Sequence, residues 1–372
     1  MTVVPLSSLF LPVAFAELPG WANDDHLPAF EAFRRSAFQC LTKPYRTGSL
    51  GVSFDSFSAA YADSRETSAT DGASARAFFE RHFVPARVAP AVPATSGFVT
   101  GFYEPVVAAS SVRTDTFTIP LLARPDDLVD IGDDNRPAGM DPYLAFARGT
   151  DSGLVEYHDR PAIEQGALAG RGLEIAWVRS KVDAFFIHVQ GAARLEMTDG
   201  TTRRVTYASK SGQHFTGIGK VLADLGEIPL EKVTMQSIRG WLAEHPDRLD
   251  EILWHNRSYI FLREAAVDDA GLGPVAAAKV PLTPGRSMAV DRLLHTFGTP
   301  FYIDAPSLTA FGGEKFRRLM IAQDTGSAIL GPARGDLFAG SGDAAGEIAG
   351  VVRDAADFYA LLPRPIVEGA AR

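Results

Sequence analysis

From about residue 110 onward, glycine and proline divide this chain into short apolar segments, and that division is the strongest constraint on its fold. The chain has 34 glycines and 24 prolines among 372 residues, about 16% of the chain where ordinary usage gives about 12%. Because these residues interrupt helices and favour turns, the surplus predicts many short strands. With 46% apolar and 22% charged residues, the chain is expected to form a soluble globular protein.

The first ninety residues are expected to be mainly helical. Apolar residues recur at three- and four-residue intervals between Leu27 and Leu41, and a second such run follows Asp71. The aromatic and β-branched segment FVTGFYEPVV (98–107) then predicts a strand that is interrupted at Pro105. This strand precedes the region of short strands and turns that begins at about residue 110.

The middle and C-terminal regions alternate between strand and helix patterns. Residues 194–209 predict a hairpin, because Asp199-Gly200 can adopt the positive φ angles of a tight turn. The expected helices are 217–226, 234–246, 247–256 and a last one near 354–363, and the expected strands are 287–290, 299–303 and 318–323. Strands on both sides of the β-rich middle predict one domain interrupted by another.

Several functions are disfavoured by composition and by missing motifs. A net charge of −9 provides no positive field, so nucleic acid is not an expected partner. Cys40 is the only cysteine, which excludes disulfides within the chain, and we expect it to fill space on a helix. His188 in FFIHVQG is expected to be a core residue of a strand. With no phosphate-binding loop and no H-E-x-x-H, neither a metal nor another cofactor is expected.

The N-terminal segment gives an ambiguous targeting signal. Residues 2–16 are mostly apolar and end in Ala14-Phe15-Ala16, but the first basic residue is Arg34, whereas a secretory signal starts with positive charge. We interpret the segment as an ordered part of the folded domain rather than an intact signal peptide. No apolar stretch reaches the 18 residues or so that a membrane-spanning helix needs.

Two aspartates near the C-terminus form the strongest candidate site. Asp324 ends a predicted strand, and a Gly/Pro-rich loop leads to Asp336, so two carboxylates are expected on neighbouring turns. Flanking glycines let a polymer approach the backbone, and Arg334 is the only positive charge nearby, which leaves burial free to raise a carboxyl pKa. A raised pKa suits a general acid. By spacing alone, both residues could equally cap turns.

Two further clusters could contact a ligand. In TGFYEP (100–105), aromatic rings beside a carboxylate suit sugar rings, which stack on aromatic faces, although buried aromatics at a strand end explain the segment equally well. Gln190 and Lys210 lie at predicted strand and turn ends, where they could orient a ligand or simply face solvent.

These segments together resemble the membrane-bound lytic transglycosylase A (MltA) family of peptidoglycan-cleaving enzymes. The resemblance extends from about residue 17 to the C-terminus and is specific, because nine segments occur in the family's order. They are TGFYEP, DPYLAFARG, DRPAIEQGAL, FFIHVQGAARL, YASKSGQHFTGIGK, NRSYIFLRE, VPLTPGRSMAVDR, GTPFYID and DTGSAILGPARGDLFAGSGDAAGEIAG.

The resemblance implies a mainly β fold with helices. A double-psi β-barrel domain would be assembled from residues 1–105 and 240–372, with an inserted β-rich domain at 106–239 and a groove between the two domains. The C-terminal part, about 285–365, looks like the 3D module, which is named for three aspartates.

The same resemblance assigns roles to individual residues. The three aspartates of the 3D module match Asp304, Asp324 and Asp336, and the catalytic acid matches Asp336, with Asp324 in a supporting role. Thr100, Tyr103, Glu104, Gln190, Lys210 and Asp304 are the expected substrate contacts.

The implied reaction is non-hydrolytic cleavage of the β-1,4 bond between N-acetylmuramic acid and N-acetylglucosamine, with 1,6-anhydromuramoyl products. The implied partners are glycan strands of peptidoglycan and other cell-wall enzymes. The protein would be a monomer and would lie in the periplasm or at the outer-membrane periphery of a Gram-negative bacterium. Many family members carry a lipid on a cysteine, and the sequence has no cysteine at the matching place.

Two alternatives remain open. An inverting glycoside hydrolase would use Asp336 as acid and Asp324 or Asp304 as base toward water. A glycan-binding module without activity would bind the same polymer and release no product.

Overall fold

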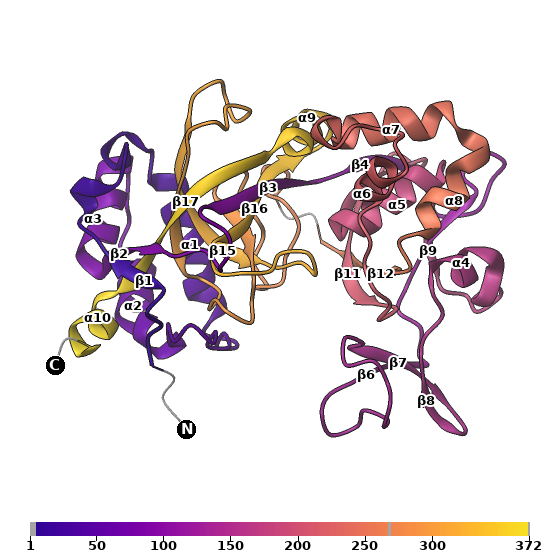
Figure 1. Cartoon of the computed structure of the whole chain (residues 1–372), viewed down its shortest axis with the longest axis horizontal. Coiled ribbons are helices and arrows are strands. Elements are labelled where there is room, and N and C mark those ends of the chain that lie inside the picture. Colours follow the sequence, from indigo (N-terminus) through magenta and orange to yellow (C-terminus); the bar gives the residue numbers. More distant parts are fainter. Residues whose placement is uncertain (1–4, 267–268, 371–372) are drawn as a thin grey trace. The chain divides into compact units, whose positions relative to one another are not determined.

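Figure 1 shows the computed structural model of the chain, which describes residues 5–266 and 269–370. The described residues form two compact units. Unit 1 contains residues 5–103 and 269–370, and unit 2 contains residues 104–266. Both units combine strands with helices, which confirms the mainly β fold with helices that the sequence predicts.

Unit 1 is built on one eight-stranded sheet, in the order β1-β2-β17-β14-β15-β13-β16-β3. Its strands are β1 (Phe10–Pro12), β2 (Phe83–Val88), β3 (Gly97–Glu104), β13 (Ser287–Val290), β14 (Pro300–Ala305), β15 (Phe316–Asp324), β16 (Arg334–Ser341) and β17 (Arg353–Pro363). An additional pairing of β17 with β3 closes β3, β17, β14, β15, β13 and β16 into a ring. Because β3 precedes unit 2 in the chain and the other five strands follow it, both parts of unit 1 are needed to close the barrel.

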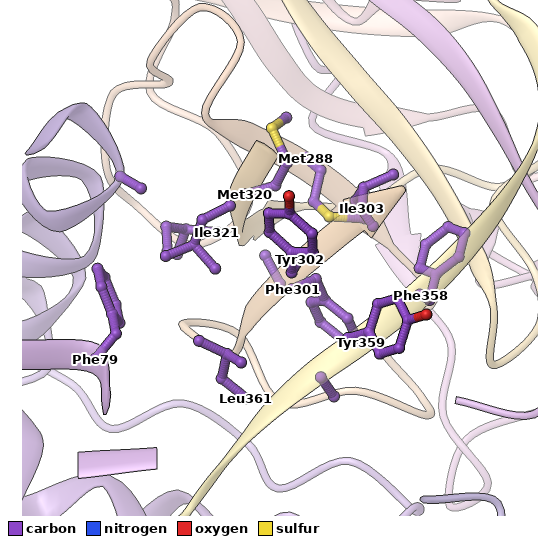
Figure 2. Close-up of a cluster of buried hydrophobic side chains, with 14 of the residues drawn as sticks. Phe79, Met288, Phe301, Tyr302, Ile303, Met320, Ile321, Phe358, Tyr359 and Leu361 are labelled. Atoms are coloured by element: carbon purple, nitrogen blue, oxygen red, sulfur yellow. The ribbon is translucent and has the colours of Figure 1, made fainter. Parts of the chain in front are cut away.

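Apolar side chains of these strands fill the core of unit 1. Figure 2 shows Phe301, Ile303, Met320 and Phe358, from β14, β15 and β17, in one buried cluster. Each of these four side chains is at most 1% exposed. Complete burial of large apolar groups on several strands is the main stabilising contribution to this unit.

The helices of unit 1 pack against the sheet or against one another. They are α1 (Leu27–Gln39), α2 (Ser58–Glu66), α3 (Gly72–His82), α9 (Asp343–Val351) and α10 (Arg364–Ala370). Gln323 of β15 fixes α1 to the sheet, because its amide nitrogen donates to Ala32 O at 2.7 Å and to Ser36 Oγ at 2.9 Å. The helices that the sequence predicts after Leu27 and after Asp71 are thus confirmed as α1 and α3.

Cys40 directly follows α1 and is half-buried. Burial raises the pKa of its thiol to about 11, which keeps the thiol protonated and unreactive near neutral pH. The prediction that this residue fills space is therefore consistent with its environment.

The N-terminal segment is part of the fold where the structure describes it. Its strand β1 pairs antiparallel with β2, with Phe10 opposite Val88. Residues 2–4 of the predicted ordered segment lie outside the described residues.

The helix predicted near residues 354–363 is wrong, because β17 occupies this stretch. The strand pairs with β14 and β2 along one half of its length and with β3 at its start, and its last six residues are all buried. A strand buried on both faces is apolar throughout, and its periodicity does not distinguish it from a buried helix.

Unit 2 has a six-stranded sheet in the order β12-β11-β10-β4-β9-β5 and a three-stranded sheet β6-β7-β8. Its strands are β4 (Val106–Ser110), β5 (Ile119–Leu122), β6 (Leu128–Asp130), β7 (Phe146–Thr150), β8 (Gly153–Val155), β9 (Glu174–Val178), β10 (Ala192–Met197), β11 (Thr202–Lys210) and β12 (Ile260–Ala265). Its helices are α4 (Arg160–Ala162), α5 (Lys181–Gln190), α6 (Ile218–Asp224), α7 (Met235–Glu244) and α8 (Leu249–Trp254). The predicted hairpin is confirmed, since β10 and β11 pair antiparallel around Gly200 with φ of 83°.

His188 lies in α5 rather than in the predicted strand. It is a core residue, as expected, and is 4% exposed with its Nδ1 at 3.3 Å from Arg160 Nη1. The apolar run around it is short, so the pattern alone could not distinguish a buried helix from a strand.

Residues 240–266 lie in unit 2, although the sequence predicts them in the first domain. Strand β12 pairs with β11, and Trp241 and Leu253 share a buried cluster with Phe185. This cluster joins elements that are far apart in the sequence, so no local sequence pattern predicts it. Among the described residues, no helix is both long and apolar enough to span a membrane.

Acid should weaken unit 1 through His295. Its Nε2 donates to Pro332 O at 2.8 Å, and burial lowers its pKa from about 6.5 to about 4. As the pH falls, the unfolded chain therefore binds the extra proton first, and stability falls between pH 6.5 and pH 4 by about 3 kcal/mol. Urea unfolding at pH 7 and pH 4.5 should show a smaller acid loss for His295→Asn than for wild type. Equal losses would contradict this assignment.

Candidate active site

Asp324 and Asp336 lie in one row across three neighbouring strands. Ala289 of β13 is the Cα partner of Asp324 on β15 and also of Asp336 on β16. Residues that face each other in register point to the same side of a sheet, so both carboxyl groups share a face. Two strand spacings of about 4.8 Å put their backbones roughly 10 Å apart. Both aspartates of the site therefore lie on strands, and Asp336 is not on the turn that the sequence predicts.

A β-bulge brings Asp324 into this row. The register shifts between Met288 and Ala289, so the partner on β15 changes from Ala322 to Asp324 and Gln323 is the extra residue. The Gln323 side chain is buried against α1. Asp324 is half-buried at the end of the strand, where its carboxylate can meet a ligand.

Burial raises the pKa of both carboxyl groups. The pKa of Asp324 rises to about 6, because burial outweighs the N–H groups of Thr325 and Ala277, and the neighbouring charge of Asp336 raises it further. Burial also raises the pKa of Asp336, against the opposing effects of Arg334 and of a hydrogen bond from Thr100. The prediction that burial would control these pKa values is confirmed in direction.

Thr100 connects Asp336 to Arg334. Its hydroxyl donates to Asp336 Oδ1 at 2.5 Å and accepts from Arg334 Nη2 at 2.7 Å. Thr100 comes from β3, and the other two residues come from β16. This contact is a second reason why both sequence parts of unit 1 are needed to build the site.

A loop before β13 holds Asp324. The backbone N–H of Ala277 donates to Asp324 Oδ1 at 3.2 Å, and that of Ala278 donates to Gln323 O at 3.0 Å. Lys279 in the same loop has a positive φ of 63°, and its charge lowers the pKa of Asp324. Nothing in the Ala-rich sequence of this loop predicts an interaction with a residue 47 positions later.

Tyr103 is a core residue near this site. It is 6% exposed, and a Cβ at Gly346 of α9 would lie only 2.9 Å from its ring. The ring therefore packs closely against α9, where only glycine fits. The burial of aromatics at this strand end agrees with the alternative interpretation of TGFYEP.

Asp304 is remote from the pair. It lies on β14 opposite Arg317 and forms an ion pair with that residue at 2.9 Å. Arg317 precedes Asp324 by seven residues on β15, which at about 3.3 Å per residue is roughly 20 Å. The three aspartates of the motif therefore do not form one cluster in this structure.

Glu104 forms a buried ion pair within unit 2. The side chain is fully buried, and its Oε1 accepts from Arg204 Nε at 2.6 Å, while its Oε2 accepts from Arg204 and Arg194 at 3.1 Å each. Both carboxylate oxygens are thereby occupied by arginine. Glu104 thus links Arg194 of β10 with Arg204 of β11 within unit 2, at a position where the sequence predicts a substrate contact.

The remaining predicted contacts are in unit 2. Gln190 is the last residue of α5, and Lys210 is the last residue of β11. Both are half-buried, and the Lys210 ammonium lies 4.9 Å from the centre of the Tyr143 ring. Within the described ranges, no group of three or more His, Cys, Asp or Glu side chains is placed to hold a metal ion.

Two family models match the chain. The MltA specific insert domain matches residues 98–263, and the 3D domain matches residues 286–362. The second match contains β13 to β16 and so contains the aspartate pair. Most of the first match lies in unit 2.

A solved structure of a membrane-bound lytic murein transglycosylase from Agrobacterium tumefaciens is similar over nearly the full length. It is 51% identical, covers 97% of this chain and 99% of that chain, and superposes with a TM-score of 0.91. The solved structure of Escherichia coli MltA with bound chitohexaose is 26% identical, covers 83% of this chain and 82% of that chain, and has a TM-score of 0.62.

Curated relatives are similar over shorter stretches. Membrane-bound lytic murein transglycosylase A of Vibrio cholerae is 36% identical over 51% of this chain and 52% of its own length. The Escherichia coli K12 protein of the same name is 32% identical over 68% of this chain and 61% of its own length. The chain thus spans about half to three fifths of the curated relatives that it matches. With both family models and a near full-length structural match, the chain belongs to the MltA family.

Proposed function

We propose that this protein is a lytic transglycosylase that cleaves the β-1,4 bond between N-acetylmuramic acid and N-acetylglucosamine in peptidoglycan. The observation that carries the proposal is Asp336, a half-buried carboxyl group whose pKa is raised by burial and whose Oδ1 is held by Thr100. A raised pKa favours the protonated form of a carboxyl group, which is the form that a general acid needs. The names of the relatives and the chitohexaose in the Escherichia coli structure support a β-linked amino-sugar polymer as substrate.

The reaction needs one carboxyl group in two states. Asp336 first donates its proton to the glycosidic oxygen, and the bond between that oxygen and C1 of the muramoyl residue breaks. The Asp336 carboxylate then takes the proton from the muramoyl 6-hydroxyl while O6 forms a bond to C1. The proton that left is replaced, no water is consumed, and the product has a 1,6-anhydro ring.

Asp324 supports Asp336 through its charge. With a pKa of about 6, Asp324 is mostly ionised at pH 7. The charges of Asp324 and Asp336 repel each other, and this interaction is mutual, so a charged Asp324 favours the protonated form of Asp336. This role needs no contact between Asp324 and the leaving oxygen.

Asp324→Asn should therefore lower the rate by about tenfold, well below the range of about 10² to 10⁴ for loss of a proton donor. Because the supporting charge is lost, the alkaline limb of its pH–rate profile should also move to lower pH. Single-turnover rates on one purified glycan, measured beside Asp336→Asn, test both points. A loss as large as that of Asp336→Asn would exchange the two roles.

The geometry is also compatible with one alternative mechanism, that of an inverting glycoside hydrolase. Backbones roughly 10 Å apart on one face leave room for a water between two carboxyl groups, as inverting glycosidases require. Asp324 would then be the base. Asp304 is a poor base in that scheme, because it is paired with Arg317 and remote from Asp336.

Muropeptides released from purified sacculi, measured by mass spectrometry with and without EDTA, test the proposed function. We expect products that end in 1,6-anhydromuramic acid, one water lighter than hydrolytic products, and the same yield after chelation. Products dominated by reducing ends would support the inverting hydrolase. Binding to sacculi with no release would support the glycan-binding module, and loss of activity with EDTA would indicate a metal.

The finer architecture is also a proposal. We infer that the closed ring of unit 1 is a double-psi β-barrel and that unit 2 is the inserted domain, with boundaries near residues 103 and 269. We infer further that Gln190 and Lys210 contact the glycan. A periplasmic or outer-membrane-associated location, a monomeric state and contacts with other cell-wall enzymes remain proposals from the family.

A further inference from the structure

The Thr100 hydroxyl forms hydrogen bonds with both Arg334 and Asp336. A hydroxyl carries one proton and two acceptor sites, whereas a guanidinium only donates. Since Arg334 Nη2 donates to Thr100 Oγ1 at 2.7 Å, the Thr100 proton is free for Asp336 Oδ1 at 2.5 Å. Thr100 therefore accepts from Arg334 and donates its own proton to Asp336 Oδ1.

Arg334 is itself held in place by two more contacts. Its Nη1 donates to Gly335 O, and its guanidinium lies 5.4 Å from the centre of the Phe98 ring. Phe98 and Thr100 are two residues apart on β3, as Arg334 and Asp336 are on β16, so each pair shares a face of its strand. The guanidinium is thus oriented before any substrate binds.

We propose that Arg334 is a positioning residue that acts through Thr100 to direct the transferable proton of Asp336 onto Oδ2. The inference rests on the proposed role of Asp336 as general acid. With Oδ1 occupied as the acceptor of the Thr100 proton, the acidic proton belongs to Oδ2, which is then the oxygen that protonates the leaving glycosidic oxygen. Random placement of the proton between the two oxygens would leave part of the enzyme unable to protonate the substrate.

The charged groups around Asp336 determine the direction in which its pKa should move when one of them is removed. Asp324 of β15 lies on the same face of the sheet as Asp336, and Arg334 lies on the same strand as Asp336. Arg353 of β17 is the Cα partner of Thr100. The charge of Lys279 lowers the pKa of Asp324. Of these, Arg334 opposes burial and lowers the pKa of Asp336, as the Thr100 hydrogen bond also does. Loss of either group should raise that pKa.

The test is the pH dependence of kcat/KM on a purified glycan. Arg334→Leu should move the alkaline limb to higher pH by about one unit, in the range expected for loss of a close opposite charge. Thr100→Val should move it in the same direction by less. Arg334→Lys and Thr100→Ser keep the charge or the hydroxyl and should return the limb to near its wild-type position.

Arg353→Leu is the matched control. Arg353 is an exposed arginine whose backbone pairs with Thr100, and its loss should leave the alkaline limb in place. A limb that moves as far in Arg353→Leu would mean a general charge effect and overturn the inference. A rate that falls equally at every pH in Arg334→Leu, with an unmoved limb, would mean a purely structural role and overturn it too.

A second readout separates this inference from the proposed function. Carbon-13 labelled aspartate lets NMR follow the Asp336 carboxyl group through a pH titration, with Asp336→Asn used to assign its signal. A higher Asp336 pKa in Arg334→Leu supports the inference even in a protein that releases no muropeptides, where only the proposed function fails. An unchanged Asp336 pKa overturns the inference even in an active enzyme.

Discussion

Asp336→Asn should lower the rate of muropeptide release from sacculi by about 10² to 10⁴, the usual contribution of a positioned general acid. The amide keeps the size of the carboxyl group and can still accept from Thr100. It has no acidic proton to give to the leaving oxygen and cannot take one from the 6-hydroxyl. Both steps of the proposed reaction therefore fail together.

The same variant should fold as well as wild type or better. Because burial raises the pKa of Asp336, the folded protein binds its proton more tightly than the unfolded chain does, and the charged form costs stability at pH 7. Urea midpoints by circular dichroism check this point. Activity within a few-fold of wild type would contradict the role of Asp336, and a lowered midpoint would trace any loss of activity to misfolding.

Glu104→Gln should destabilise unit 2 by about 3 to 5 kcal/mol, as expected when one partner of a buried ion pair is lost. Glu104 is fully buried, and the side chain of Arg204 is 3% exposed, so Arg204 would lose the carboxylate charge of Glu104 in a site with little access to water. Trp177, Trp241 and Trp254 lie in unit 2 and provide fluorescence signals for its unfolding. Separate probes are needed because a chain of two units need not unfold in one step.

Glu264→Gln is the control for that measurement. Glu264 pairs with Arg203 at 3.1 Å on the same sheet, but this pair is 55% and 35% exposed, and such pairs contribute at most about 1 kcal/mol. If Glu104→Gln costs no more than Glu264→Gln and instead raises KM for the glycan, Glu104 is the substrate contact that the sequence predicts.

The sequence located the aspartate pair because the signals there are local. Asp324 and Asp336 stand beside glycines and short apolar strands, and the order of the surrounding segments matches a known family. The prediction of a raised pKa needed only the scarcity of positive charge nearby. What the sequence could not provide was the register through Ala289, since it depends on a bulge at Gln323.

The roles of residues whose partners are far along the chain are harder to predict from the sequence. Glu104 meets arginines 90 and 100 positions later, so nothing near it in the sequence distinguishes an ion pair from a ligand contact. Asp304 belongs to a named motif, and only the pairing of β14 with β15 reveals its distance from the other two aspartates. The role inferred for Arg334 likewise depends on Thr100, which comes from a strand on the other side of unit 2 in the sequence.

Cleavage of purified sacculi in water enriched in oxygen-18 tests the central claim most directly. If the muramoyl 6-hydroxyl replaces water, the released muropeptides contain no oxygen-18 at C1 and carry the 1,6-anhydro ring, and Asp336→Asn releases almost none of them. Products that end in reducing N-acetylmuramic acid and are one water heavier would show that water attacks C1, and would contradict the account.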